Sequence, residues 1–355
     1  MLEISFKNNK IYIYLICINS FNGGKNMKYY KLLAIFMALS MIFTGCVSRD
    51  NDKENSSEES SSSSSSETSE ITVNNSAEEI PADEVTNESS EESSEESAPE
   101  EEDVELPPPD LDKISKLSGE YIPWGPGVHK DNDGRPIACT GLQEKYGKYD
   151  AHFIAPMEKK IYLTFDEGYE NGNTANILDV LKEKDVSAVF FVTLEYAKRN
   201  PELIQRMIDE GHIVGNHSAG HPNYTKISLE EAMDATMKLH QYMLDEYDYK
   251  MTLFRYPEGA FSEQVAALLQ SLGYKQVFWS FAYADWDPKN QMAPDAAFEK
   301  VYGATHDGAI YLLHAVSETN SNILGKLIDT WRNDGYEIPR YDVEYDLSES
   351  SESEE

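Results

Sequence analysis

The sequence predicts an α/β fold in which alternating strands and helices form an irregular, TIM-like (β/α)7 barrel that is not fully closed. Short apolar runs rich in β-branched residues alternate with longer amphipathic stretches, and six or seven such units fit within about 180 residues. No glycine-rich phosphate loop follows the first strand, which argues against a dinucleotide-binding fold. The pattern is typical of parallel strands covered by helices.

The expected elements alternate along the chain. Strands are expected at 160–165, 187–193, 212–216, 251–255, 275–281 and 309–314. Helices are expected at 173–184, 201–210, 229–247, 262–272, 294–303 and 321–334. Two helix starts carry clear local signals, since Pro201 occupies a first helical position after Asn200, and Ser228 with Glu231 forms a capping box.

Acidic residues are concentrated outside this predicted barrel. The formal net charge is -34, and residues 47–106 hold 21 acidic and 2 basic side chains, while residues 341–355 hold 7 acidic and no basic ones. We therefore predict a disordered Ser/Glu-rich linker at 47–107 and a disordered acidic tail at 341–355, because neither can bury enough apolar surface to fold. This charge argues against nucleic acid as a partner, since phosphates would be repelled.

Residues 1–46 predict export. Lys28 and Lys31 precede an apolar stretch that ends at Phe43, and small residues lead from there to Cys46. This arrangement is typical of a secretory signal with Met27 as the expected start, and its apolar part is too short to span a membrane. Cleavage before Cys46 resembles the processing of bacterial lipoproteins, so we expect a lipid anchor there. An ordinary signal peptide with a coincidental cysteine is the alternative.

The rest of the chain divides into an extension and a barrel domain. Residues 108–157 are rich in turn signals, and we expect them to pack as a loop-rich extension on the domain at 158–340. The chain has three cysteines, and only Cys139 falls within these two segments. A disulfide framework is therefore not expected, and the core alone must hold the domain together.

Two neighbouring carboxylates stand at the centre of the predicted site. Asp166 and Glu167 end the first predicted strand of the barrel and precede Gly168. In α/β folds, chemistry is usually placed at the carboxyl ends of the strands. Adjacent carboxylates repel each other unless a cation lies between them or one takes a proton. Taken alone, Asp166, Glu167 and Gly168 would more often form a solvated acidic turn.

Further polar residues follow four other predicted strands. His217 and His221 can face one metal ion if the chain forms a helical turn there, and with the two carboxylates they predict a divalent metal site. Zn²⁺ suits such nitrogen and oxygen ligands, with Co²⁺ or Mn²⁺ as alternatives. Arg255 can orient a carboxylate, while Asp285 and His314 also end strands. A surface arginine, a capping aspartate and a core histidine are the plainer interpretations of these three.

Taken together and in this order, the stretches resemble the polysaccharide deacetylases of carbohydrate esterase family 4. The resemblance covers about residues 120–340 and rests on Thr164-Phe165-Asp166-Glu167-Gly168, His217-Ser218-Ala219-Gly220-His221, Arg255-Tyr256-Pro257-Glu258-Gly259, Ala284-Asp285-Trp286 and Leu312-Leu313-His314. The branch that forms muramic δ-lactam in spore cortex is similar in Trp124-Gly125, Thr164 to Asn171, Gly211 to Ser218, Val277 to Ser280 and Gly308 to Ser317.

The resemblance implies acid–base roles for four residues. Asp166 would be the general base that activates the attacking water, and Arg255 would orient it. His314 would be the general acid that protonates the departing amine, and Asp285 would hold the charge of His314. These roles suit amide hydrolysis, which needs a nucleophilic water and a proton delivered to nitrogen.

The resemblance also implies metal and substrate contacts. His217 and His221 would bind the metal, with Glu167 in the position where the wider family has Asp. Contacts to the substrate and to the oxyanion are implied for Glu258, through its backbone N–H, and for Tyr256 and Trp286. Tyr256 and Glu258 differ from the commoner residues of their motif, which is expected to alter the substrate groove.

The expected function is metal-assisted removal of the acetyl group from peptidoglycan amino sugars, with N-acetylmuramic acid as the first choice. The expected location is the outer face of a bacterial membrane, with glycan strands as partner. N-acetylglucosamine or a chitooligosaccharide is the alternative substrate, and a non-catalytic glycan-binding accessory lipoprotein is the alternative class. The lactyl carboxylate of muramic acid requires a cationic contact, for which the sequence offers only Lys159, Lys160 and Lys275.

Overall fold

The computed structural model describes residues 2–7, 10–15 and 107–345. The predicted signal with Met27 and Cys46, the linker up to residue 106, and residues 346–355 of the predicted tail lie outside the described residues. Strands β1 (Leu2–Lys7) and β2 (Lys10–Leu15) pair antiparallel and belong to a separate unit of the chain. Among the described residues, no helix combines the length and apolar character that crossing a bilayer requires.

Seven strands of the second unit form one sheet in the order β3-β8-β7-β6-β5-β4-β9, and their pairings are parallel. They are β3 (Ala151–His152), β4 (Ile161–Glu167), β5 (Val189–Val192), β6 (Ile213–Asn216), β7 (Leu253–Phe254), β8 (Lys275–Val277) and β9 (Ala309–His314). The segment that directly follows β8 lies beside β9, where the Ser280 N–H donates to the Ile310 carbonyl at 2.8 Å. The sheet therefore curls into a partial barrel, which confirms the predicted fold class.

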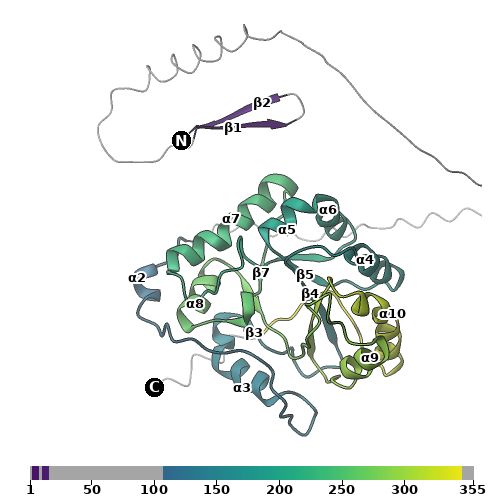
Figure 1. Cartoon of the computed structure of the whole chain (residues 1–355). Helices are drawn as coiled ribbons and strands as arrows, with labels where there is room; N and C mark the ends of the chain where they lie inside the picture. The colour runs from purple at the N-terminus through teal and green to yellow at the C-terminus, as the bar shows by residue number, and fades with distance from the viewer. Residues whose placement is uncertain (1, 8–9, 16–106, 346–355) are drawn as a thin grey trace, which may run out of the picture. The chain divides into compact units, whose positions relative to one another are not determined.

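Helices surround this sheet (Figure 1). They are α2 (Leu111–Ile114), α3 (Ile137–Tyr146), α4 (Thr174–Glu183), α5 (Leu194–Arg199), α6 (Pro201–Asp209), α7 (Leu229–Tyr247), α8 (Glu263–Ser271), α9 (Pro294–Tyr302) and α10 (Glu318–Asn333). The six predicted helices lie within three residues of these bounds. Helix α10 begins at Glu318 rather than at 321 because the Ser317 side chain accepts a hydrogen bond from the Asn320 N–H and caps it there.

Strand alternation divides the apolar residues into two cores. A large core lies between the outer face of the sheet and the helices, whereas a small one fills the barrel and includes Tyr162, Val189, Phe191 and Ile310. Gly215 faces the Phe191 ring, and a Cβ at this position would come within 2.5 Å of that ring. Only glycine therefore lets the phenyl group fill the interior.

The C-terminal segment corrects one expected boundary. Residues 341–345, expected to be part of a disordered tail, pack against the base of the barrel. Tyr341 is 7% exposed and Val343 is 3% exposed, and both belong to the interior core. The acidic residues of this segment alternate with apolar ones, so that one side can be buried while Asp342 and Glu344 face outward. A count of charges alone hides this alternation.

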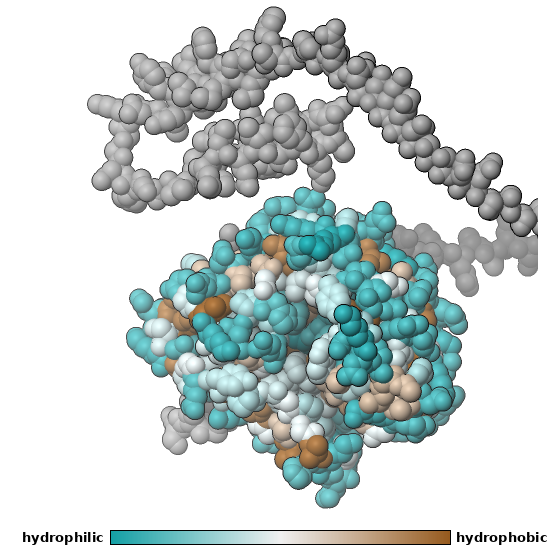
Figure 2. Space-filling view, in the orientation of Figure 1, coloured by the Kyte–Doolittle hydropathy of each residue, from teal (hydrophilic) through white to brown (hydrophobic). Residues whose placement is uncertain are grey.

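The segment at 108–157 contributes to the barrel through more than loops. It carries α3 and supplies β3, an edge strand of the sheet. Ile122 forms a β-bridge with Phe261, and the Trp124 ring packs edge-on against Phe153 and Trp279. The outer surface in view is mostly hydrophilic, with apolar residues in small separate groups (Figure 2).

Candidate active site

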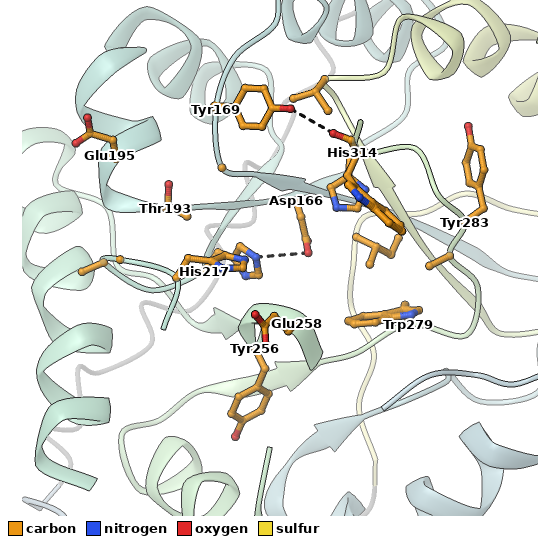
Figure 3. A pocket seen from close by; sticks show the side chains of 18 residues that line it. Asp166, Tyr169, Thr193, Glu195, His217, Tyr256, Glu258, Trp279, Tyr283 and His314 are labelled. Atoms are coloured by element: carbon orange, nitrogen blue, oxygen red, sulfur yellow. Dashed lines mark hydrogen bonds and ion pairs between the residues drawn. The ribbon is translucent and has the colours of Figure 1, made fainter. Parts of the chain in front are cut away.

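A cavity of about 780 Å³ opens at the carboxyl ends of the strands. This size is ordinary for a small-molecule site, and the position is the usual one for barrel enzymes. Its polar wall includes Asp166, His217, His221, His314, Glu195 and Glu258, and its aromatic wall includes Tyr169, Trp279, Tyr283 and Trp286. Asp166 lies between His217 and His314 (Figure 3). Side chains that are far apart in the sequence thus converge on one site.

Asp166 is held by a fully buried arginine. Arg255 Nη1 donates to Asp166 Oδ1 at 2.9 Å and to Thr164 Oγ1 at 2.7 Å, and its other nitrogens donate to the Val277 and Phe278 carbonyls. Burial of the Asp166 carboxyl opposes its ionisation, but the combined effect of Arg255, His217 and His314 outweighs burial and lowers the pKa of Asp166. The carboxylate is therefore ionised and fixed in orientation.

His314 is paired with Asp285 across the cavity from His217. His314 Nδ1 lies 2.7 Å from Asp285 Oδ1, and the His314 backbone N–H donates to Asp285 Oδ2 at 2.9 Å. Burial favours the neutral ring, but the hydrogen bond and the charge of Asp285 outweigh it and raise the pKa of His314. Because Nδ1 is committed to Asp285, Nε2 is the ring nitrogen left for chemistry in the cavity.

The two remaining histidines lie on a strained loop rather than on the helical turn that their spacing predicted. The ring centroids of His217 and His221 are 4.9 Å apart. Of the six non-glycine residues with positive φ in the described part of the chain, three lie beside the cavity, namely Ser218, His221 and Glu258. Backbone strain of this kind clusters at functional sites because the surrounding structure must maintain it.

The chemistry of His217 favours a cation beside it. His217 Nδ1 lies 2.9 Å from the Arg255 carbonyl, which can only accept, so Nδ1 carries the hydrogen. Burial lowers the pKa of His217 to about 4, which leaves Nε2 with a free lone pair that faces Asp166 Oδ2 at 3.6 Å. Two acceptors that face each other are stabilised by a cation between them, so His217 fits as a metal ligand, and the His221 ring lies 4.9 Å from it.

Glu167, the expected acidic ligand, lies elsewhere. It does not line the cavity, it is fully buried, and both of its carboxyl oxygens lack a hydrogen-bond partner. Burial raises the pKa of Glu167 well above its ordinary value. Strand β4 continues through Glu167, so its side chain leaves the sheet on the face opposite to that of Asp166. Within the described residues, no group of three or more His, Cys, Asp or Glu side chains is arranged to hold a metal.

The other expected contact residues differ in their surroundings. Trp286 is 57% exposed at the cavity, and its ring lies edge-on to His314. Glu258 lines the cavity with φ 60°, and its carboxylate accepts a hydrogen bond from Asn223 at 2.9 Å. The Tyr256 ring points away from the cavity (Figure 3), and its hydroxyl donates to Gln276 Oε1 at 2.7 Å. Its hydroxyl is therefore occupied in the core.

Sequence reasoning missed several cavity residues. Tyr169 and Trp279 lie within the stretches Thr164 to Asn171 and Val277 to Ser280, which carry the family resemblance. Their aromatic character next to a catalytic motif could have indicated that they line the cavity. Thr193 and Glu195 have no such signal, because they follow β5 without any recognisable motif. The three lysines considered for the lactyl carboxylate do not line the cavity. Instead, Lys159 donates a hydrogen bond to the Asp334 carbonyl. Lys160 forms an ion pair with Glu158, and Lys275 forms one with Glu344.

The partial barrel, the fixed carboxylate and the His–Asp pair together define a hydrolase with an acid–base site at the carboxyl ends of its strands. The family model for polysaccharide deacetylase matches residues 154–277. The chain is 41% identical over 233 residues to the peptidoglycan-N-acetylmuramic acid deacetylase PdaA of Bacillus subtilis, covering 64% of this chain and 86% of that protein. The chain belongs to the polysaccharide deacetylases of carbohydrate esterase family 4, and it is a polysaccharide N-deacetylase.

Solved structures agree with this assignment. The structure of Bacillus subtilis PdaA matches with a TM-score of 0.60 and 40% identity, over 63% of this chain and 96% of that one. A family 4 carbohydrate esterase from Bacillus anthracis matches with a TM-score of 0.52 and 37% identity, over 63% and 95%. The peptidoglycan-N-acetylglucosamine deacetylase PgdA of Listeria monocytogenes is 35% identical over 191 residues, 54% of this chain and 40% of that protein. Members of the family are typically metal-dependent.

Proposed function

We propose that this protein removes the acetyl group from N-acetylmuramic acid residues of peptidoglycan. The observation that carries the proposal is the placement of Asp166 and His314 opposite each other in adjacent strands, within one cavity that also contains two histidines. The 41% identity to PdaA, whose name states this substrate, supports the choice of sugar. Amide hydrolysis needs a base and an acid on either side of the scissile bond, and these two residues are suited to that work.

The proposed reaction transfers one proton to Asp166 and another from His314. Asp166 accepts a proton from water, the water oxygen forms a bond to the acetyl carbon, and His314 Nε2 gives its proton to the amide nitrogen. The carbon–nitrogen bond then breaks, which releases acetate and leaves a free amine on the sugar. Arg255 keeps Asp166 ionised, and Asp285 keeps His314 protonated. General acid–base catalysis of this kind contributes roughly 10²- to 10⁴-fold.

Two further groups would assist this reaction. A divalent metal held by His217 and His221, with zinc as the expected ion, would supply Lewis-acid activation of the water and of the acetyl carbonyl. The backbone N–H of Glu258 would stabilise the oxyanion, and support for this comes from its strained conformation at the cavity wall.

The test is the release of acetate and the appearance of free amines on purified glycan strands. We expect the wild-type enzyme to release acetate from muramic acid residues of strands stripped of stem peptides, and Asp166→Asn to lose this activity. Strands that retain stem peptides serve as the comparison. Equal release by the two proteins would show that Asp166 is not the base and would refute the assignment of the site.

The charge of the cavity favours a second candidate substrate, N-acetylglucosamine in peptidoglycan or in a chitooligosaccharide. Three carboxylates line the cavity, Asp166, Glu195 and Glu258, whereas none of its described lining residues is lysine or arginine. An uncharged sugar would meet less repulsion there than one that carries a lactyl carboxylate. Release of acetate from chitooligosaccharides at a higher kcat/KM than from stripped glycan strands would favour this candidate.

We further propose that the enzyme is exported, attached to the membrane through lipid on Cys46, and active on spore cortex as part of the δ-lactam pathway. The signal-like leader and the acidic linker support export and reach into the wall. Labelling of cells with a palmitate analogue should mark the wild-type protein and not Cys46→Ala. Labelling of both proteins would place the lipid elsewhere.

A further inference from the structure

One loop makes hydrogen bonds to both of the segments that carry the His314–Asp285 pair. This β4–α4 loop, residues 168–173, directly follows β4. The Tyr169 hydroxyl donates to the Trp286 carbonyl at 3.2 Å. The side-chain amides of Asn171 and Asn173 both donate to the Val316 carbonyl, each at 3.0 Å. Figure 3 shows Tyr169 with the hydrogen bond of its hydroxyl drawn as a dashed line.

The β4–α4 loop is itself fixed from beneath. Glu170 Oε1 accepts hydrogen bonds from the backbone N–H groups of Gly172 and Thr174, at 2.5 and 3.4 Å. Glu170 Oε2 accepts from the Thr174 hydroxyl and, at 3.2 Å, from the Tyr196 hydroxyl of α5. The Tyr196 side chain is fully buried. A loop that is held in this way can act as a rigid support for its neighbours.

The two carbonyls that the β4–α4 loop contacts lie next to the catalytic pair in the chain. Trp286 follows Asp285 directly, and Val316 lies two residues beyond His314. Neither carbonyl belongs to a strand or a helix, so the regular ladder of hydrogen bonds does not fix it. Of these donors, Asn173 is buried at 9% exposure, whereas Tyr169 is 52% exposed.

We propose that Tyr169, Asn171 and Asn173 are positioning residues that hold the His314–Asp285 pair in register with Asp166. The inference rests on the role of His314 as general acid in the proposed function. The physical reason is that proton delivery depends steeply on geometry, so that a displacement of about 1 Å at the acid costs on the order of 10²-fold in rate. Hydrogen bonds from a neighbouring strand–helix unit remove that freedom before substrate binds.

Tyr169→Phe isolates one of these contacts. The substitution keeps the aromatic ring at the cavity and removes only the hydroxyl that bonds to the Trp286 carbonyl. We expect kcat to fall about 5-fold while KM changes less than about 2-fold, because the substrate-facing ring is retained. A fall in kcat/KM that comes entirely from KM would mean that Tyr169 only binds substrate, and would overturn its positioning role.

The double variant Asn171→Ser/Asn173→Ser tests the Val316 contacts. Serine is as good as asparagine at the N-cap position of α4, which Asn173 occupies, but it is too short to reach the carbonyl. Asn200→Ser is the matched control, since Asn200 is an N-cap that donates to the Tyr196 carbonyl at the same 3.0 Å, away from the cavity. We expect kcat to fall about 10- to 100-fold in the double variant and to stay within about 2-fold in the control.

The titration of His314, followed by NMR of its ring, separates this inference from the proposed function. The charged groups that act on His314 are Asp285, Asp166 and Arg255. If the positioning contacts hold the pair together, the double variant lowers the His314 pKa toward the ordinary value of about 6.5, whether or not the enzyme turns over a chosen substrate. An unchanged His314 titration, together with a loss of thermal stability equal to that of Asn200→Ser, would overturn the positioning role.

Discussion

Asp166 and His314 are register partners in the neighbouring parallel strands β4 and β9. Directly paired residues of a sheet point to the same side, which here is the inside of the barrel. The backbones of the proposed base and acid are therefore held by the hydrogen bonds of two buried strands, and the β4–α4 loop adds contacts to the segments that follow His314 and Asp285. Sites built on regular elements in this way are held more precisely than sites on loops.

Arg255→Lys should damage both stability and catalysis. Lysine keeps the charge, but it cannot form the fork that contacts Asp166, Thr164 and two carbonyls at once. We expect the free energy of unfolding to fall by about 3 kcal/mol, measured in urea, and kcat to fall about 100-fold. Arg332→Lys, which alters an exposed arginine, should change neither quantity appreciably. Wild-type kcat in Arg255→Lys would mean that charge alone orients the base.

The Asp285–His314 pair should set the alkaline limb of the pH profile. The general acid must carry its proton, so kcat/KM falls as the pH rises through the raised pKa of His314. Asp285→Asn removes the charge that raises this pKa, so the alkaline limb should move to lower pH and kcat near neutral pH should fall about 100-fold. An alkaline limb that stays in place would exclude His314 as the acid.

The Asp285–His314 pair should also make the free energy of unfolding depend on pH. A histidine whose pKa is raised by folding stabilises the fold fully below its ordinary pKa of about 6.5, and this contribution is lost as the pH rises through the raised pKa. The gap in unfolding free energy between the wild type and Asp285→Asn should therefore narrow on the alkaline side. Asp166 behaves in the opposite way, since its lowered pKa makes its contribution disappear only as the pH falls through that value.

How far the sequence predicts this site depends on the element that carries each residue. Asp166, Arg255 and His314 could be placed because each ends a strand that periodicity identifies, and parallel strands end at one edge. Glu167 could not be placed, because strand periodicity did not show that β4 extends through Glu167. This extension directs the Glu167 side chain to the outer face of the sheet. Asn320 likewise carried no signal, although its side-chain amide donates to Asp285 Oδ2 at 2.6 Å from helix α10.

Glu167→Gln should leave metal binding intact. The raised pKa of Glu167 means that the buried group is held in its neutral form, which glutamine imitates in size and charge. We expect its Zn²⁺ affinity, measured by calorimetry, to stay within about 3-fold of wild type, whereas His221→Gln should weaken it by at least about 10-fold. A loss in Glu167→Gln as large as that in His221→Gln would show that the carboxylate turns toward the histidines when metal binds.

Glu258→Gln should change substrate preference rather than chemistry. Its side chain is exposed at the cavity, and the substitution removes one of three carboxylates there while keeping the backbone unchanged. We expect KM for stripped glycan strands, which carry lactyl carboxylates, to fall about 2- to 5-fold at low salt and less at high salt. KM for neutral chitooligosaccharides serves as the reference and should not move. An equal change for both substrates would exclude charge as the cause.

Gly259→Ala should show how the N-terminal extension supports the cavity wall. A Cβ at Gly259 would lie 2.7 Å from Trp279 Cη2 and 3.0 Å from Trp124 Cδ1, and φ is +65°. Gly127→Ala is a matched control, because Gly127 has a similar φ of +69° but no atom within 4 Å of the added carbon. Both variants carry the cost of a left-handed alanine, about 1 kcal/mol, so the difference between them measures the contact alone.

We expect Gly259→Ala to lose about 1–3 kcal/mol of unfolding free energy beyond the loss in Gly127→Ala, because the two indole rings must shift. Trp279 lies 5.7 Å from the Arg255 guanidinium group and lines the cavity, so its displacement should also lower kcat/KM in Gly259→Ala and not in the control. Equal losses of stability and activity in both variants would mean that the Trp124–Trp279 contact does not support the site. A stability loss without an activity loss would confine its role to folding.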